Sequence, residues 1–157
     1  MKTRDFPGEL EVHWESSPPG WAQDFHSFAS DLIIDLGVVS CEASITLCGD
    51  ETIRTYNRTY RGKDEATDVL SFEAEPDLQP IPRSRLAGDL LISLPTVALN
   101  ADYFGVTFTE ELKRVTLHGI LHLLGWDHGT NEPGEPMLVY QENFLNHRGR
   151  IVNFEKT

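Results

Sequence analysis

The chain has 157 residues, of which 25 are acidic and 13 are Lys or Arg, and its formal net charge at pH 7 is −12. This charge excludes broad, nonspecific binding to nucleic acid, which depends on Lys and Arg, and restricts any RNA contact to a local site. The length is typical of one domain, and we expect residues 1–157 to form a single domain.

The ends and the cysteines indicate a cellular compartment. The first residues, MKTRDFPGEL, contain charges but no apolar signal-peptide core, and no segment approaches the roughly 20 apolar residues of a membrane span. Cys41 and Cys48 are separated by an odd number of positions, which places them on opposite faces of any strand they share. We expect two reduced, half-buried thiols in a soluble, cytoplasmic protein.

The hydrophobic pattern of the first half alternates between the strand period and the helix period. We expect strands at residues 10–14 and 43–47 and helices at 21–36 and 51–60. Gly37 should end the first helix, and Asp50 is the expected N-cap of the second helix.

The second half begins with a polar loop at residues 61–68 that lacks periodicity. We expect strands at 69–72 and 86–94, an irregular proline-rich excursion at 75–85, and helices at 96–103, 108–124 and 137–146. Thr107 and Glu110 form a capping-box signature for the helix at 108–124. The element order predicts an α+β fold in which a small mixed four-stranded sheet packs with helices. We expect the helix at 108–124 to be a zincin-like metal helix, because it carries His118 and His122.

Three histidines within LHGILHLLGWDH, residues 117–128, predict a metal site. His118 and His122 are four residues apart on the predicted helix, so both side chains project from one face. Gly125 can adopt the left-handed conformation that turns the chain back, which brings His128 toward the same point. Three imidazoles leave a fourth position of a tetrahedral ion for water, as in catalytic zinc sites, and we expect one Zn²⁺ per chain.

Each histidine also has an ordinary interpretation, because single buried histidines are usually core residues that make a hydrogen bond. The glycine and the third histidine favour the metal site. Asp127 either orients an imidazole by accepting its other N–H or is an exposed turn residue. Leu117, Leu121 and Leu124 lie on a different helix face, and we expect them in the core.

Gly119 occupies the position at which zinc peptidases of the H-E-x-x-H type carry a glutamate. That glutamate supplies the acid and base for peptide hydrolysis, so its replacement weakens a peptidase or amidohydrolase interpretation. Phosphodiester cleavage depends more on positioning and on neutralising charge. Asp68 and Glu111 are conceivable proton carriers for such a reaction.

A local cluster of basic residues precedes the polar loop and contains Arg54, Arg58, Arg61 and Lys63. Arg61 is the preferred phosphate ligand, because a guanidinium group binds two phosphate oxygens in a fork. Arg54 and Arg58 are equally well explained as a solvated helix face paired with nearby acids. Tyr56 and Tyr60 can stack on RNA bases, although aromatic residues at helical spacing are more often core.

Three sequence blocks together resemble the YbeY family of bacterial endoribonucleases. They are YRGKDEATDVLSF at 60–72, GDLLIS at 88–93 and HGILHLLGWDH at 118–128. The resemblance extends from about Ile45 to Leu145. Ala66 and Glu73 stand where the family usually has prolines, which changes the stiffness of the loop but leaves the histidines intact.

The resemblance implies a zinc-dependent, single-strand-specific endoribonuclease that matures the 3′ end of 16S rRNA and takes part in ribosome quality control. It implies zinc ligands at His118, His122 and His128, and a functional arginine at Arg61. The implied partners are single-stranded rRNA, the small ribosomal subunit and ribosomal proteins, with no membrane.

Two interpretations of function follow. In the first, His118, His122, His128 and Arg61 form a catalytic site, with either water or the RNA 2′-hydroxyl as the nucleophile. In the second, the protein is a ribosome-assembly factor with a structural zinc and little intrinsic nuclease activity, which the acidic charge favours.

Overall fold

The computed structural model describes residues 5–74, 84–147 and 154, which contain four strands and five helices. The strands are β1 (Gly8–Trp14), β2 (Ser40–Cys48), β3 (Val69–Glu73) and β4 (Arg85–Ser93). The helices are α1 (Ala22–Asp35), α2 (Asp50–Arg61), α3 (Leu94–Phe104), α4 (Phe108–Leu123) and α5 (Pro136–Asn146). Within these ranges, no helix combines the length and the hydrophobicity that crossing a membrane requires.

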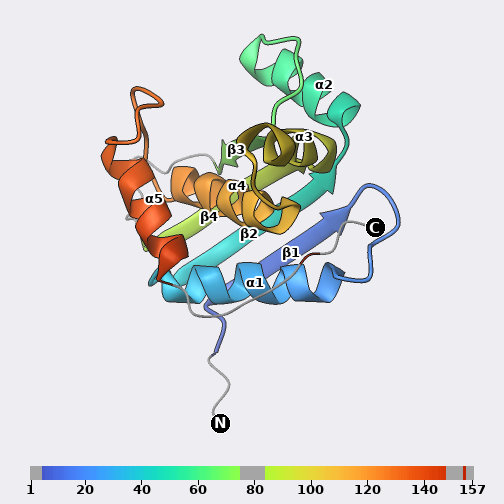
Figure 1. The fold of residues 1–157 in the computed structure, drawn as a ribbon. Coiled ribbons are helices and arrows are strands. Elements are labelled where there is room, and N and C mark those ends of the chain that lie inside the picture. Colours follow the sequence, from blue (N-terminus) through green and yellow to red (C-terminus); the bar gives the residue numbers. More distant parts are fainter. Residues whose placement is uncertain (1–4, 75–83, 148–153, 155–157) are drawn as a thin grey trace.

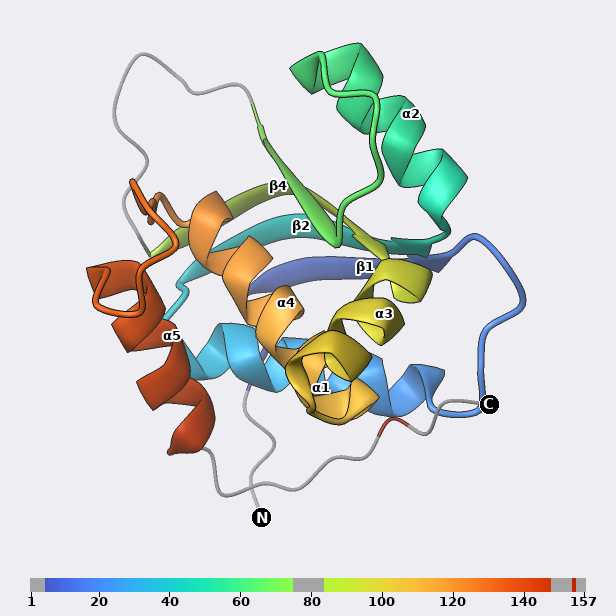
Figure 2. The same ribbon diagram turned by 45° about the horizontal axis from the view of Figure 1, so that its top comes forward.

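The strands form one mixed sheet in the order β1-β2-β4-β3. β1 pairs with β2 and β2 pairs with β4 in parallel, whereas β3 pairs with β4 in the antiparallel direction. Helices α1, α3 and α4 lie on one side of the sheet and α2 lies on the other (Figures 1 and 2). The predicted α+β fold with a small mixed four-stranded sheet is therefore confirmed.

The two faces of the sheet bury separate hydrophobic clusters. The larger cluster joins α1, α3, α4 and the sheet, and it includes the three leucines predicted for the core, Leu117, Leu121 and Leu124. The smaller cluster is formed by Cys48, Ile53, Leu70 and Leu91 beneath α2. Along β2 the residues that face the larger cluster are apolar, whereas most of those that alternate with them toward the other face are polar, namely Ser40, Glu42, Ser44 and Thr46. The hydrophobic cluster on the second face is therefore small and lies beneath α2.

The cysteines lie on opposite faces of β2, as their spacing predicts. Cys41 belongs to the larger cluster and Cys48 to the smaller one, and both are free thiols. Both are more buried than expected, each being 4% exposed. Burial raises the pKa of each thiol to about 11, so both remain protonated at neutral pH.

The expected boundaries agree closely with the structure, but the predicted cap of α2 is wrong. Gly49 is the N-cap, and Asp50 is already inside the helix. The Asp50 carboxylate instead accepts hydrogen bonds of 2.6 Å from the hydroxyl groups of Ser93 and Thr96, and so links α2 to the start of α3. For α4, the Thr107 side chain accepts from the Glu110 N–H, as the capping box predicts. The predicted excursion at 75–85 lies mostly outside the described residues.

Candidate metal centre and cavity

His118 and His122 project from one face of α4, and their Nε2 atoms lie 3.1 Å apart. The helix ends at Leu123, and Gly125, two residues later, has a φ of +93°, the left-handed conformation expected there. This turn sends the chain back, and the His128 ring centroid lies 5.2 Å from that of His118 and 5.5 Å from that of His122. The structure thus brings together the three histidines that the sequence singled out.

The three imidazoles can bind one metal ion. One ligand atom from each lies within 4.8 Å of the others. Two nitrogens bound to a tetrahedral zinc ion at roughly 2.0–2.1 Å would lie about 3.3 Å apart, close to the spacing of the His118 and His122 Nε2 atoms. Two unprotonated nitrogens at this distance repel each other unless a cation or a proton lies between them, so the donor set fits a metal.

In His118 and His128, a hydrogen bond at Nδ1 determines which of the two ring nitrogens carries the proton. Gln141 Oε1 lies 2.8 Å from His118 Nδ1, and the Thr130 carbonyl oxygen lies 2.8 Å from His128 Nδ1. Because both oxygens only accept, each Nδ1 carries the proton and each Nε2 keeps its lone pair for a metal.

Burial keeps the two helix histidines neutral. It lowers the pKa of both His118 and His122 below the ordinary value of 6.5. For His122 the neighbouring rings of His118 and His128 lower the pKa further, whereas the charge of Asp127 and a backbone hydrogen bond with Trp126 raise it. Neutral imidazole is the form that binds metals, so these shifts favour metal binding at neutral pH.

The orientation of Gln141 is itself determined by a chain of polar contacts between α4 and α5. Its Nε2 donates to the Glu142 carboxylate at 3.1 Å, which leaves Oε1 to face His118. Glu142 in turn binds Arg114 through contacts of 3.0 and 3.1 Å. Arg114 also pairs with the buried Glu111 at 3.2 Å. The sequence reasoning missed Gln141, because only the docking of α5 on α4 brings it to His118.

Within the described part of the chain, the Asp127 side chain makes no hydrogen bond with an imidazole ring. Its Oδ1 accepts from the backbone N–H of His128 at 2.8 Å, which stabilises the turn after Gly125. The orienting acceptors are therefore the Gln141 side chain and the Thr130 carbonyl.

Replacing Gln141 with leucine is expected to weaken zinc binding by about 10- to 100-fold, the usual effect of losing an outer acceptor of a metal-bound histidine. The physical reason is that the His118 Nδ1–H loses its partner and the ring is free to rotate. Competition with a chromophoric chelator measures the zinc affinity. Asn143→Leu, at an exposed position of the same helix, is the control and should bind zinc like the wild type. Equal affinities for the two variants would contradict the orienting role.

Gly119 lies where α4 packs closely against the sheet. A Cβ at this position would lie 2.9 Å from Leu90 Cδ2 and 3.1 Å from Val69 Cγ2. The Ser71 hydroxyl also donates to the Gly119 carbonyl at 3.2 Å. A larger residue at this position would require the Leu90 and Val69 side chains to shift, so close packing against β3 and β4 favours glycine where the zinc-peptidase motif has glutamate.

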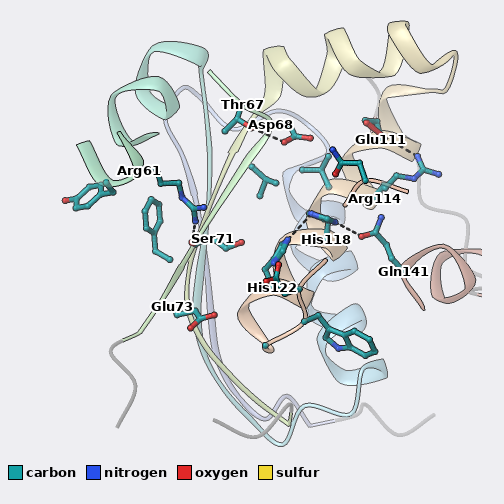
Figure 3. A pocket seen from close by; sticks show the side chains of 18 residues that line it. Arg61, Thr67, Asp68, Ser71, Glu73, Glu111, Arg114, His118, His122 and Gln141 are labelled. Carbon is teal, nitrogen blue, oxygen red and sulfur yellow. Dashed lines mark hydrogen bonds and ion pairs between the residues drawn. The ribbon is translucent and has the colours of Figure 1, made fainter. Parts of the chain in front are cut away.

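The histidines open into a cavity of about 1190 Å³ between α2, β3, α4 and α5. Figure 3 shows Arg61 at one side of the cavity and His118 and His122 at the other, with Ser71 between them. The Arg61 guanidinium donates to the Ser71 carbonyl at 2.8 Å and lies 5.9 Å from the centre of the Phe72 ring. The structure therefore brings Arg61 into the same cavity as two of the three predicted ligands.

The other two arginines of the basic cluster have different surroundings. Arg54 binds the Asp64 carboxylate through contacts of 2.9 and 3.2 Å, and Arg58 lies 3.7 Å from the same carboxylate. These contacts agree with the interpretation of an exposed helix face paired with an acid. Among the described residues, no carboxylate lies within ion-pair distance of Arg61.

Comparison with known proteins identifies the family. The family profile described as Endoribonuclease YbeY matches residues 20–149. The chain belongs to this family. Two proteins named Endoribonuclease YbeY illustrate the similarity. The one from Treponema denticola is 39% identical over 140 residues, which cover 87% of this chain and 90% of that protein. The one from Borreliella afzelii is 40% identical over 131 residues, which cover 81% and 86%.

The fold is also shared with a solved structure. The solution structure of a Thermotoga maritima protein matches with a TM-score of 0.61 and 24% sequence identity, covering 88% of this chain and 87% of that one. The YbeY profile includes the segments that carry Arg61, the three histidines and Gln141.

The polar loop departs from the usual YbeY pattern at Ala66, and α2 stabilises the loop by other contacts. The buried Asn57 side chain donates to the Glu65 carbonyl at 2.9 Å, one residue before Ala66. Arg54 holds Asp64 as described above. Two side chains of the helix thus hold the loop without the proline.

Two carboxylates that sequence reasoning raised as proton carriers also line the cavity, and they differ in environment. Glu111 is buried, and burial raises its pKa while the Arg114 contact opposes the shift. Asp68 is partly exposed and accepts from the Thr67 hydroxyl at 3.3 Å. Because Glu111 already pairs with Arg114, Asp68 is the less constrained of the two.

Proposed function

We propose that this protein is a zinc-dependent, single-strand-specific endoribonuclease that acts in 3′-end maturation of 16S rRNA and in ribosome quality control. In this proposal residues 1–157 form one cytoplasmic hydrolase domain, and the small ribosomal subunit with its proteins is the partner. His118, His122 and His128 hold one Zn²⁺, and Arg61 binds the scissile phosphate. The observation that carries the proposal is the convergence of three imidazoles, two of which line one cavity with Arg61, in a chain of the YbeY family.

Each proposed role follows from a contact in the cavity. When bound, a zinc ion supplies Lewis acidity and positive charge for phosphodiester cleavage. Gln141 and the Thr130 carbonyl orient the imidazoles that hold it. Arg61 neutralises charge that develops on the phosphate, and the Ser71 carbonyl keeps its guanidinium at the cavity wall.

A second candidate is favoured by the distribution of charge. The net charge is −12, and two of the arginines near the cavity share the Asp64 carboxylate. A protein with this negative charge is expected to bind RNA weakly on its own. Weak binding favours a ribosome-assembly factor with a structural zinc and little nuclease activity. In that case chelation of the metal lowers the thermal stability, and pure protein does not cut RNA.

The test is cleavage of a labelled single-stranded fragment from the 3′ region of 16S rRNA. Zinc-loaded wild-type protein is expected to cut this fragment, to leave the same sequence intact when it is annealed to its complement, and to lose activity with chelator. A protein that contains one zinc per chain and cuts neither RNA would support the assembly factor instead.

The product ends identify the nucleophile in the same experiment. A 2′,3′-cyclic phosphate on the upstream product indicates attack by the RNA 2′-hydroxyl. A linear monophosphate formed without a cyclic precursor indicates attack by water.

A further inference from the structure

An exposed aromatic cluster borders the cavity beside Arg61. Tyr56 and Tyr60 lie one turn apart on α2, and their rings stack with centroids 5.8 Å apart. Phe72 on β3 packs edge to face against Tyr60, with centroids 5.6 Å apart. Tyr60 is 66% exposed, so it does not belong to the core, although aromatic residues at this spacing usually do.

One end of the aromatic cluster lies at the cavity. Tyr60, Phe72 and Arg61 line the cavity, whereas Tyr56 does not. One side of the Tyr60 ring is covered by Tyr56, so the stack runs from Tyr56 toward the cavity and ends at Tyr60. An additional flat ring would extend this stack.

We propose that Tyr60 is a stacking platform for one unpaired base of the RNA, next to the phosphate bound by Arg61, and that Phe72, which packs beside both tyrosines, holds the platform in place. This inference rests on the proposed function and adds the recognition of a single-stranded base to it. A stacking site suits an acidic protein, because base stacking contributes affinity that does not depend on further cations. It also explains a preference for single strands, because a base inside a duplex already stacks on its neighbours.

A nucleobase is favoured over other flat or apolar ligands by the charge beside the platform. Arg61 lies 5.9 Å from the centre of the Phe72 ring and makes no ion pair within the described ranges, so a phosphate attached to the stacked ring meets a cation. Every base has a π-face, so we expect the platform to discriminate little among sequences.

The experiment compares two probes that carry the same backbone charge. One is a short labelled 2′-O-methylated oligouridylate, in which no 2′-hydroxyl can attack, and the other is an oligonucleotide of equal length without bases. Gel electrophoresis after each measurement verifies that both probes are uncut. Fluorescence anisotropy at one fixed salt concentration measures both affinities for zinc-loaded full-length protein. Tyr60→Ala is expected to weaken binding of the oligouridylate about tenfold and to leave binding of the abasic probe unchanged. Tyr60→Phe, which keeps the ring, should retain the wild-type affinity for both probes.

Tyr103→Ala is the matched control, because Tyr103 is an 83% exposed tyrosine on α3 that does not line the cavity. It should bind both probes like the wild type. If Tyr60→Ala binds the oligouridylate like the wild type while the wild type still cleaves RNA, the stacking platform is wrong and the proposed function stands. If the wild type neither binds nor cleaves single-stranded RNA, the proposed function fails and the platform fails with it.

Discussion

Replacing His122 with alanine is expected to remove the bound zinc and RNA cleavage together. His122 Nε2 lies 3.1 Å from His118 Nε2, and no other described residue offers an imidazole at that position. Losing a direct ligand should weaken zinc binding by more than the roughly 100-fold upper range for losing an outer acceptor. Metal analysis of the purified variant and the single-strand cleavage assay measure the two effects on the same sample.

The control for this variant is His13→Ala. His13 is an exposed histidine on β1 that contacts Glu11 at 3.2 Å, and it does not line the cavity. It should keep one zinc per chain and full activity. Thermal unfolding of the metal-free proteins separates a folding defect from a binding defect, since metal-free His122→Ala should unfold near the temperature of metal-free wild type. Full cleavage by a zinc-free His122→Ala sample would refute the catalytic role of the metal.

Replacing Arg61 with alanine is expected to lower the rate of RNA cleavage by about 10²–10³-fold while the zinc content stays at the wild-type level, because a preorganised donor to the developing charge is lost. Arg61→Lys should recover part of this loss, since lysine keeps the charge but loses the two-pronged geometry of guanidinium. Single-turnover cleavage with saturating enzyme measures the chemical step apart from RNA binding.

Arg58→Ala is the matched control, because Arg58 lies on the same helix but faces Asp64 and does not line the cavity. Its effect on the rate should be small, as for other exposed ion pairs. A loss of activity equal to that of Arg61→Ala would mean that the cleavage depends on the general positive charge of α2. Loss of zinc from Arg61→Ala would mean that the variant damages the metal centre, and the phosphate role would then lack support.

The local parts of the fold and of the site were accessible from the sequence, because they depend on contacts between near neighbours in the chain. Helix periodicity placed His118 and His122 on one face, and Gly125 at the end of α4 predicted the turn that returns His128. Local sequence patterns predicted less well where a residue could serve two different roles. Asp50 has the chemistry of an N-cap, but Ser93 and Thr96 engage its carboxylate.

The sequence pattern also did not predict whether Tyr56 and Tyr60 are buried or exposed. The four-residue spacing of Tyr56 and Tyr60 is compatible with a buried face or with an open one. The structure decides between them, because the buried Ile53 and Asn57 make the contacts of α2 with the sheet and the loop, while Tyr60 remains on the outside.

The sequence by itself determined the element order and the spacing of the histidines, since both depend on the helix and strand periods and on glycine at one turn. Only the tertiary structure decided that Gln141 accepts from His118, that Gly119 packs against Leu90, and that Arg61 faces the histidines. The reason is physical: these contacts join residues far apart in the chain, and they form only when α2, α4 and α5 have packed around the sheet.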